Sequence, residues 1–362
     1  MKILFVVDSL GAGGAQRQVV SLASKLSSLE YEIELLNYYP NINFFRNELL
    51  SYNIKIYDIQ KNSRFTLKII FYIIYLLKRN RYDCVISFLD TPNLYCEIAK
   101  LLSFSRVFLV VSERSSRYYV KKRLNKICHM LANKVVANSY DHGDWLKSFP
   151  YLKRKVDIIY NGYEITKKFI TKTKSHNYNF LVIGRIDKGK NGLNLIKALV
   201  EISRKNSPSP NIQWVGSETS SKESLSYRKQ MDELLSKHPK VLNNWEWMGH
   251  RKDINRLLEQ ADALIHISLY EGLPNAICEA LVAGRPVIAS NVCDHPRLVE
   301  DNIRGILCDP VSVESICSAI ERFVNLTSEE RLKMVINARR YAEQHLSIDR
   351  MVSEYEKLLI LN

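Results

Sequence analysis

Short apolar runs bounded by turn residues recur along the chain, and segments with helical periodicity separate them. This alternation is typical of a parallel α/β protein, in which each buried strand is followed by a helix that covers the sheet. In the first half the pattern predicts strands over residues 3–7, 33–37, 54–57, 84–88, 108–112 and 134–137. It predicts helices there over residues 15–27, 67–79, 92–102 and 122–131.

The same alternation returns in the second half of the chain. It predicts strands over residues 180–183, 212–215, 263–267, 287–289 and 305–307. It predicts helices over residues 193–204, 224–237, 254–260, 274–283, 313–324 and 328–344. Between the halves, residues 166–177 are polar and rich in Lys and Thr, which predicts a linker. We therefore expect Rossmann-like domains over residues 1–165 and 178–345, with parallel sheets that face each other across a ligand-binding cleft.

Chain length and composition agree with two domains and with a protein that stays in the cytoplasm. A chain of 362 residues exceeds what one hydrophobic core usually organises. The seven cysteines are scattered and form no Cys-x-x-Cys pair, which predicts reduced thiols in the cytoplasm and no structural zinc. The longest apolar run, residues 69–77, is far shorter than the roughly 20 residues that a membrane span requires. We expect a cytoplasmic protein without a membrane-spanning helix.

Positive charge is concentrated in the first domain. The chain carries a net charge of +14, of which residues 1–165 contribute +10. Such a surface suits nucleic acid, an anionic membrane face or a phosphorylated substrate, and a merely soluble basic surface is an equal alternative. Residues 64–79 interleave aromatic and basic side chains, so they predict either a core helix or an amphipathic helix on a membrane surface.

A glycine turn follows the first predicted strand. Gly13 and Gly14 lie where backbone N–H groups can approach an anion or a substrate closely. Gln16 stands where a dinucleotide-binding turn would carry a third glycine or alanine, which disfavours a dinucleotide site. The turn either contacts substrate or needs small residues only for its backbone conformation.

The second domain opens with two cations around a predicted helix start. Gly184 and Arg185 leave a strand, and Lys190 enters the next helix. An arginine fork, a lysine point charge and a helix N-terminus together suit a diphosphate. A solvated run of charges is the alternative.

Residues 270–286 read as a loop followed by a short helix. Pro274 is suited to the first helical position and Gly284 to a left-handed C-terminal cap. The backbone from Gly272 to Asn275 offers free N–H groups to an anion. Glu271 lies in the loop and Glu279 in the helix, so they are poorly placed as a simple acid and base pair. Contact with sugar hydroxyls is the more natural interpretation.

The order and spacing of these motifs together resemble one family. The motifs are Gly13-Gly14-Ala-Gln16, Asn161-Gly162, Gly184-Arg185 with Lys190, Ala261-Asp262, and the segment from Glu271 to Pro286. The chain resembles the retaining glycosyltransferases of family 4, of the bacterial surface-polysaccharide type, whose two-domain Rossmann fold is called GT-B. The spacing of Glu271 and Glu279 matches the paired glutamates of that family.

The resemblance implies a role for each residue of the second domain. Arg185 and Lys190 would hold the donor diphosphate, Glu279 the ribose hydroxyls, and Glu271 would approach the donor sugar. The remaining donor contacts would come from Gly184, Gly249, His250, Gly272, Leu273, Pro274 and Asn275. The resemblance assigns catalysis to Glu271, Arg185 and Lys190, requires no metal or other cofactor, and favours a UDP-sugar donor.

On the acceptor side the resemblance is looser. Relatives carry a histidine in the first domain where this chain has Glu113 and Arg114. Glu113 is expected either to bind acceptor or sugar or to form an ion pair with Arg114 or Arg117. The family binds acceptor in its first domain, so Gly13, Gly14 and Gln16 are further candidates. The C-terminal helix, residues 346–362, is expected to return to the first domain as in relatives.

The resemblance leads to a functional expectation. The chain is expected to transfer a sugar from a nucleotide sugar to a lipid-linked saccharide in the assembly of capsule, O-antigen or exopolysaccharide. This work would take place at the inner face of the cell membrane, without nucleic acid. The alternatives are a nucleotide-sugar 2-epimerase of the same fold and a non-enzymatic protein that binds membrane or nucleic acid.

Overall fold

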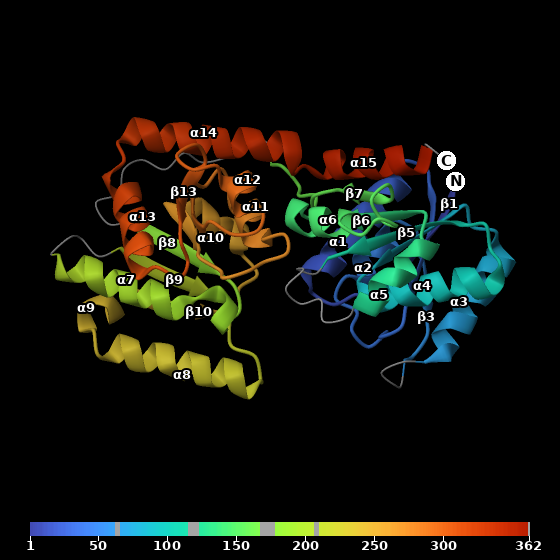
Figure 1. Cartoon of the computed structure of the whole chain (residues 1–362), viewed down its shortest axis with the longest axis horizontal. Helices are drawn as coiled ribbons and strands as arrows, with labels where there is room; N and C mark the ends of the chain where they lie inside the picture. The colour runs from blue at the N-terminus through green and yellow to red at the C-terminus, as the bar shows by residue number, and fades with distance from the viewer. Residues whose placement is uncertain (62–65, 115–122, 167–177, 206–209, 361–362) are drawn as a thin grey trace. The chain divides into compact units, whose positions relative to one another are not determined.

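The computed structural model describes residues 1–61, 66–114, 123–166, 178–205 and 210–360. The chain divides into two compact units, shown with their elements in Figure 1. The first unit joins Met1–Glu164 to Ser347–Asn362, and the second is Ile165–Leu346. Most of the predicted linker, residues 167–177, lies outside the described residues.

The first unit is built on a parallel sheet of seven strands within the described residues, in the order β3-β2-β1-β4-β5-β6-β7. The strands are β1 Lys2–Val7, β2 Glu32–Asn37, β3 Lys55–Asp58, β4 Cys84–Phe88, β5 Phe108–Glu113, β6 Lys134–Ala137 and β7 Val156–Ile158. The helices are α1 Gly14–Ser28, α2 Arg46–Ser51, α3 Leu67–Asn80, α4 Asp90–Ser103, α5 Arg123–Cys128, α6 Tyr140–Lys147 and α15 Ile348–Ile360, with a 3₁₀ turn η2 His129–Leu131.

Both faces of this sheet are covered. Ile3 and Phe5 of β1 belong to one core cluster, which includes residues of α1 and α15, while Leu4 and Val6 belong to another, which includes residues of α3 and α4. Successive side chains of a strand point to opposite faces, so a strand buried on both sides reads as a continuous apolar run. This is why the sequence pattern located these strands.

The C-terminal helix α15 belongs to the first unit. Its residues Met351, Val352 and Tyr355 are buried in the core cluster that contains α1. The backbone N–H of Ile348 donates to the carbonyl of Tyr163 at 3.0 Å. The predicted return of the C-terminal helix to the first domain is therefore confirmed.

The second unit has a parallel sheet of six strands among its described residues, in the order β10-β9-β8-β11-β12-β13. The strands are β8 Asn179–Ile183, β9 Asn211–Val215, β10 Trp245–Gly249, β11 Ala263–His266, β12 Val287–Ser290 and β13 Gly305–Cys308. The helices are α7 Gly192–Arg204, α8 Lys222–Ser236, α9 Pro239–Leu242, α10 Ile254–Gln260, α11 Asn275–Val282, α12 His295–Val299, α13 Val313–Asn325 and α14 Ser328–His345, with a 3₁₀ turn η3 Lys188–Lys190.

Helix α11 begins one residue later than predicted. Pro274 is its N-cap and not its first helical residue. At the other end Gly284 has φ +66°, and the N–H of Arg285 donates to the carbonyl of Ala280 at 2.7 Å. This is the left-handed glycine cap that the sequence predicted. Among the described helices, none combines the length and the apolar character needed to cross a membrane.

Candidate active site

The carboxyl ends of β8 and β11 bring two predicted residues together. The two strands are neighbours in a parallel sheet, so they end at the same edge. Turn η3, which carries Lys190, lies after β8, and the loop with Glu271 follows β11. The N–H of Leu269 donates to the carbonyl of Gly189 at 2.8 Å and joins the loop to the turn.

Lys190 and Glu271 form an ion pair at this edge. Lys190 Nζ donates a short hydrogen bond to Glu271 Oε1, and the two side chains remain 20% and 17% exposed. The lysine side chain crosses Gly184, because a Cβ added to Gly184 would lie 2.9 Å from Lys190 Cε. A larger residue at position 184 would therefore displace the lysine from the carboxylate.

A buried histidine, His266, contacts the carboxylate of Glu271. His266 Nε2 lies 3.1 Å from Glu271 Oε1, and Ser268 Oγ lies 3.3 Å from the same nitrogen. Burial and then the charge of Lys190 lower the pKa of His266, so at neutral pH the ring is neutral and its N–H donates a hydrogen bond to the carboxylate. Burial alone would raise the pKa of Glu271, but the hydrogen bond from His266 and the charge of Lys190 outweigh it and hold that pKa well below its usual range. Glu271 is thus a fixed carboxylate.

Sequence reasoning missed His266 and its neighbour His295. The two rings lie 5.3 Å apart between centroids, and burial lowers the pKa of His295 to about 3. The available signal was the position of His266, which ends β11 five residues before Glu271. A lone histidine in an apolar strand is more often a core residue, so this signal is weak.

Glu279 is the second carboxylate of the paired motif, and its surroundings differ. It lies in α11 and is partly buried, and burial raises its pKa to about 7. No ion pair to Glu279 occurs among the described residues. A partner that donates hydrogen bonds would favour the ionised form.

The other predicted donor residues lie at the same edge of the sheet. Arg185 follows β8 and is largely exposed, with Nη2 3.6 Å from Asp187 Oδ2. Gly249 ends the edge strand β10 with φ +62°, and its carbonyl accepts from the N–H of Gly216 at 2.8 Å. His250 is exposed. The segment Gly272, Leu273, Pro274 and Asn275 leads into α11.

In the first unit, the glycine turn lies beside a carboxylate. Gly13 caps α1, and Gln16 Nε2 donates to Asp8 Oδ1 at 2.9 Å, at the end of β1. A Cβ added to Gly13 would lie 2.2 Å from Gln16 Oε1. Gly13 therefore leaves room for the Gln16 side chain to fold back, and Gly14 is the first residue of the helix.

Glu113 is sealed in the interior of the first unit. Its side chain has no exposed surface, and it accepts a short hydrogen bond from Lys126. His129 Nε2 lies 2.9 Å and His142 Nε2 3.4 Å from its oxygens. Glu113 therefore presents no surface to a sugar, and its ion pair is with Lys126 and not with Arg114. Ser115, Ser116 and Arg117 lie outside the described residues.

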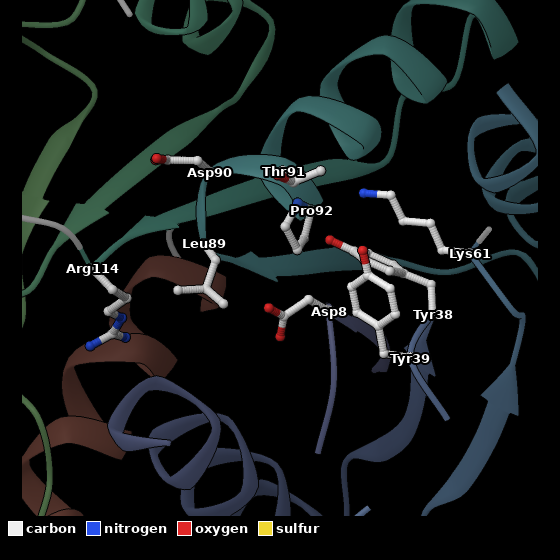
Figure 2. A pocket seen from close by; sticks show the side chains of 9 residues that line it. All are labelled: Asp8, Tyr38, Tyr39, Lys61, Leu89, Asp90, Thr91, Pro92 and Arg114. Carbon is white, nitrogen blue, oxygen red and sulfur yellow. The ribbon is translucent and has the colours of Figure 1, made fainter. Parts of the chain in front are cut away.

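Arg114 instead lines a pocket within the first unit, shown in Figure 2. The pocket has a volume of about 380 Å³, within the range of small-molecule sites. Its walls contain several residues that sequence reasoning did not single out, namely Asp8, Tyr38, Tyr39, Lys61, Leu89, Asp90, Thr91 and Pro92.

Two family models match the chain. The model described as "Glycosyl transferases group 1" matches residues 164–341, and "Glycosyltransferase Family 4" matches residues 12–167. An α-1,4-N-acetyl-D-galactosaminyltransferase of Campylobacter jejuni is 25% identical over 99% of this chain and 98% of its own length. A second N-acetylgalactosaminyltransferase of that organism is 24% identical over 92% of each chain.

Solved structures share the fold at lower identity. Anabaena Alr3699/HepE in complex with UDP superposes with a TM-score of 0.86 at 19% identity and covers 100% of both chains. The lipopolysaccharide outer core galactosyltransferase WaaB in its apo form gives a TM-score of 0.79 at 17% identity, over 100% of this chain and 99% of its own. The predicted GT-B fold class is confirmed.

The two family matches together run from residue 12 to residue 341. Both describe glycosyltransferases, and so do the names of the relatives, which makes this chain a transferase. The matches support neither the epimerase nor the non-enzymatic alternative. The chain belongs to glycosyltransferase family 4.

Proposed function

We propose that this enzyme transfers a sugar, with retention, from a nucleoside-diphosphate sugar to a lipid-linked saccharide in the assembly of a bacterial surface polysaccharide. The observation that carries the proposal is the cluster of Lys190, Glu271 and His266 at the carboxyl ends of β8 and β11. It sets a cation and a fixed carboxylate side by side, where α/β sheets bind ligands.

In the proposed mechanism, Lys190 and Arg185 offset the charge of the departing diphosphate. The bond between the anomeric carbon and the phosphate oxygen breaks, and its electron pair leaves with the phosphate. Cations already in place at that oxygen stabilise the transition state without reorganisation. The acceptor oxygen bonds to the anomeric carbon on the same face, and its proton passes to the leaving phosphate.

Glu271 acts on the sugar in this proposal. A carboxylate that stays ionised accepts hydrogen bonds from sugar hydroxyls and stabilises positive charge at the ring. His266 positions it, because a neutral buried imidazole holds one oxygen in place. Before the donor binds, the ion pair between Lys190 and Glu271 avoids two uncompensated charges in a largely buried place.

The donor is proposed to be a UDP-sugar, bound without a metal. The Anabaena structure that shares this fold contains UDP, which supports the choice of base. Gly249 and His250, at the end of β10, offer backbone groups to the base, and Glu279 offers its carboxylate to the ribose hydroxyls.

A donor and product assay tests this proposal. Purified enzyme is screened for thermal stabilisation by UDP, GDP and ADP, because a ligand of the native state raises the melting temperature. The anomeric configuration of the transfer product is then read by NMR. Stabilisation by UDP and a retained configuration are expected. Stabilisation by none of the three diphosphates contradicts the donor site, and an inverted product contradicts the mechanism.

The acceptor and the membrane contact are proposed from the relatives and from α3. The name of the Campylobacter relative includes diNAcBac-PP-undecaprenol, a lipid-linked saccharide. In α3 one face is core, as one of the two sequence interpretations expected, and the opposite face exposes apolar Leu67, Phe71 and Tyr75. The exposed cations Lys68, Lys78 and Arg79 belong to the same helix. We therefore propose that α3 rests on an anionic membrane surface.

Vesicle sedimentation tests this contact. The wild type is expected to sediment with vesicles that contain phosphatidylglycerol and to stay in solution with pure phosphatidylcholine. The double variant Phe71→Ser with Tyr75→Ser is expected to bind about tenfold more weakly, because it would bury less apolar surface in the membrane. Leu332→Ser, also at an exposed apolar residue, is the matched control. Unchanged binding by the double variant contradicts the contact.

A further inference from the structure

The pocket of the first unit lies where five parallel strands end. Each strand from β1 to β5 is followed by part of its wall, in the order Asp8, then Tyr38 and Tyr39, then Lys61, then Leu89 to Pro92, then Arg114. Figure 2 shows Lys61, Tyr38 and Tyr39 on one side of the pocket and Arg114 on the other, with Asp8 and Leu89 between them. Open α/β sheets bind ligands at this edge.

Lys61 is the unusual residue of this wall. It is 7% exposed, and its Nζ lies 4.9, 5.7 and 5.2 Å from the ring centroids of Tyr38, Tyr39 and Tyr95. No carboxylate of the described chain lies within ion-pair distance of this ammonium. Burying a charge without a partner is costly, and aromatic faces compensate only part of that cost. An anion in the pocket would supply the missing partner.

Arg114 is a second cation with neutral partners. Its guanidinium donates to Asn161 Oδ1 at 2.5 Å and to the hydroxyl of Tyr355 at 3.0 Å, and it lies 4.5 Å from the ring centroid of Phe88. Its Nε is buried without a hydrogen-bond partner. Across the described residues, neither cation of this pocket is paired with a carboxylate.

The remaining polar wall suits hydroxyl groups. Asp8 and Asp90 offer carboxylate oxygens, which accept hydrogen bonds from a saccharide. Asp90 Oδ1 lies 3.5 Å from Lys126 Nζ. Asp90 is also the first residue of α4, whose first backbone N–H groups point toward this edge of the sheet. Leu89 has φ +80°, a strained backbone of the kind that collects at ligand sites.

We propose that this pocket binds an anionic group of the acceptor saccharide and that Lys61 selects for it. The inference rests on the proposed function, since it names the chemistry of the acceptor. The ligand would carry an anionic group next to sugar hydroxyls. Its source is either the phosphate that joins saccharide to lipid or the carboxylate of an acidic sugar.

Ligand-observed NMR titrations of the full chain, saturated with UDP at low ionic strength, test the proposal. The probes are N-acetylglucosamine 1-phosphate, glucuronic acid and neutral N-acetylglucosamine. The wild type is expected to prefer at least one anionic probe over the neutral sugar by about tenfold, as charge-assisted hydrogen bonds imply. Preference for the phosphate alone assigns the linkage to lipid, and preference for the carboxylate alone assigns an acidic sugar.

Variants of two lysines show whether the preference for an anionic probe comes from Lys61 itself or from the positive charge of the first unit in general. Lys61→Met keeps the apolar stem among the tyrosines but removes the charge, and it is expected to abolish the preference, while Lys61→Arg keeps it. The matched control is Lys55→Met. Lys55 also lies over a tyrosine, 4.7 Å from the ring centroid of Tyr57, but it is 62% exposed and outside the pocket. This control is expected to behave as the wild type.

Three results overturn the inference: equal binding of charged and neutral probes, binding of none of them, or a preference that survives in Lys61→Met. Thermal unfolding of each variant shows whether it is folded. The failure of the proposed function looks different, because UDP would then not bind. If UDP binds and the anion preference is absent, only the inference about Lys61 fails.

Discussion

Each unit of this enzyme holds one glutamate with a lysine and a histidine, and the two arrangements differ in access. Glu113 ends β5 and meets Lys126 and His129, with no exposed surface on the glutamate and 2% on the lysine. Glu271 lies in a loop after β11 and meets Lys190 and His266, and its side chain is 17% exposed. The same three residue types thus build an interior junction in one unit and a reachable site in the other.

The protonation states of the two clusters explain their different uses. His129 bridges Glu113 and Glu97, whose Oε1 lies 2.5 Å from its Nδ1. Burial opposes its charge, but the hydrogen bonds of the two glutamates raise the pKa of His129 to about 9, so it is a cation locked between carboxylates. His266 stays neutral, and the single cation Lys190 is free to exchange its carboxylate for a phosphate. The first arrangement stabilises a fold, and the second suits a ligand.

The largest expected effect is on stability, from Glu113→Gln. This change leaves the buried charges of Lys126 and His129 without their shared carboxylate, so the free energy of unfolding should fall by about 3–5 kcal/mol. Urea denaturation measures it. The matched change Glu271→Gln should cost less, because Lys190 and Glu271 remain 20% and 17% exposed and Lys190 can turn toward water. Equal losses of unfolding free energy in the two variants would contradict the difference that we describe between the two glutamate clusters.

The second effect is on catalysis, from Lys190→Ala. Loss of the preorganised cation should lower kcat by about 100- to 1,000-fold while the protein stays folded. Lys188→Ala, which changes an exposed lysine of the same turn, serves as the control and should keep nearly full activity. Full turnover by the Lys190 variant contradicts its role at the leaving group.

A third effect is a pH dependence of stability that belongs to the first cluster. The pKa of His129 is raised from 6.5 to about 9 on folding, so its contribution is complete below about pH 6.5 and is lost as pH rises through about 9. The free energy of unfolding should fall across that window by up to about 1.4 kcal/mol per pH unit. His129→Gln should flatten this slope, whereas exposed His250→Gln should preserve it. A slope that persists without His129 assigns the pH dependence elsewhere.

The sequence predicted the longer elements because their buried residues form a clear pattern of apolar positions. Strands such as β1 and β4 are apolar on both faces, and α7 and α13 carry a full amphipathic period. The strands β7 and β10 and the helices α2, α6, α9 and α12 were missed, because each buries at most three residues and so gives little apolar pattern to detect.

The candidate site could be predicted only where a motif fixes the spacing. Lys190 and Glu271 follow from their motifs, and the structure brings them together. The seal on Glu113 could not be predicted, because it depends on Lys126 and His129, which reach the end of β5 from other elements. Around Lys61, Tyr38 and Tyr39 come from the segment directly after β2 and Tyr95 comes from α4, so their convergence could not be predicted from the sequence either.

The smallest expected effect concerns a third glutamate, which has neither the lysine nor the histidine. Burial alone raises the pKa of Glu279 to about 7, so ribose hydroxyls should bind its ionised form and donor affinity should rise through that pH. KM for the donor should therefore fall between about pH 6 and pH 8 in the wild type. Glu279→Gln should raise KM about tenfold and remove this dependence, with little change in kcat. If the variant keeps the wild-type pH profile, Glu279 does not bind the donor, and Glu271 is then the one glutamate of the paired motif that contacts the substrate.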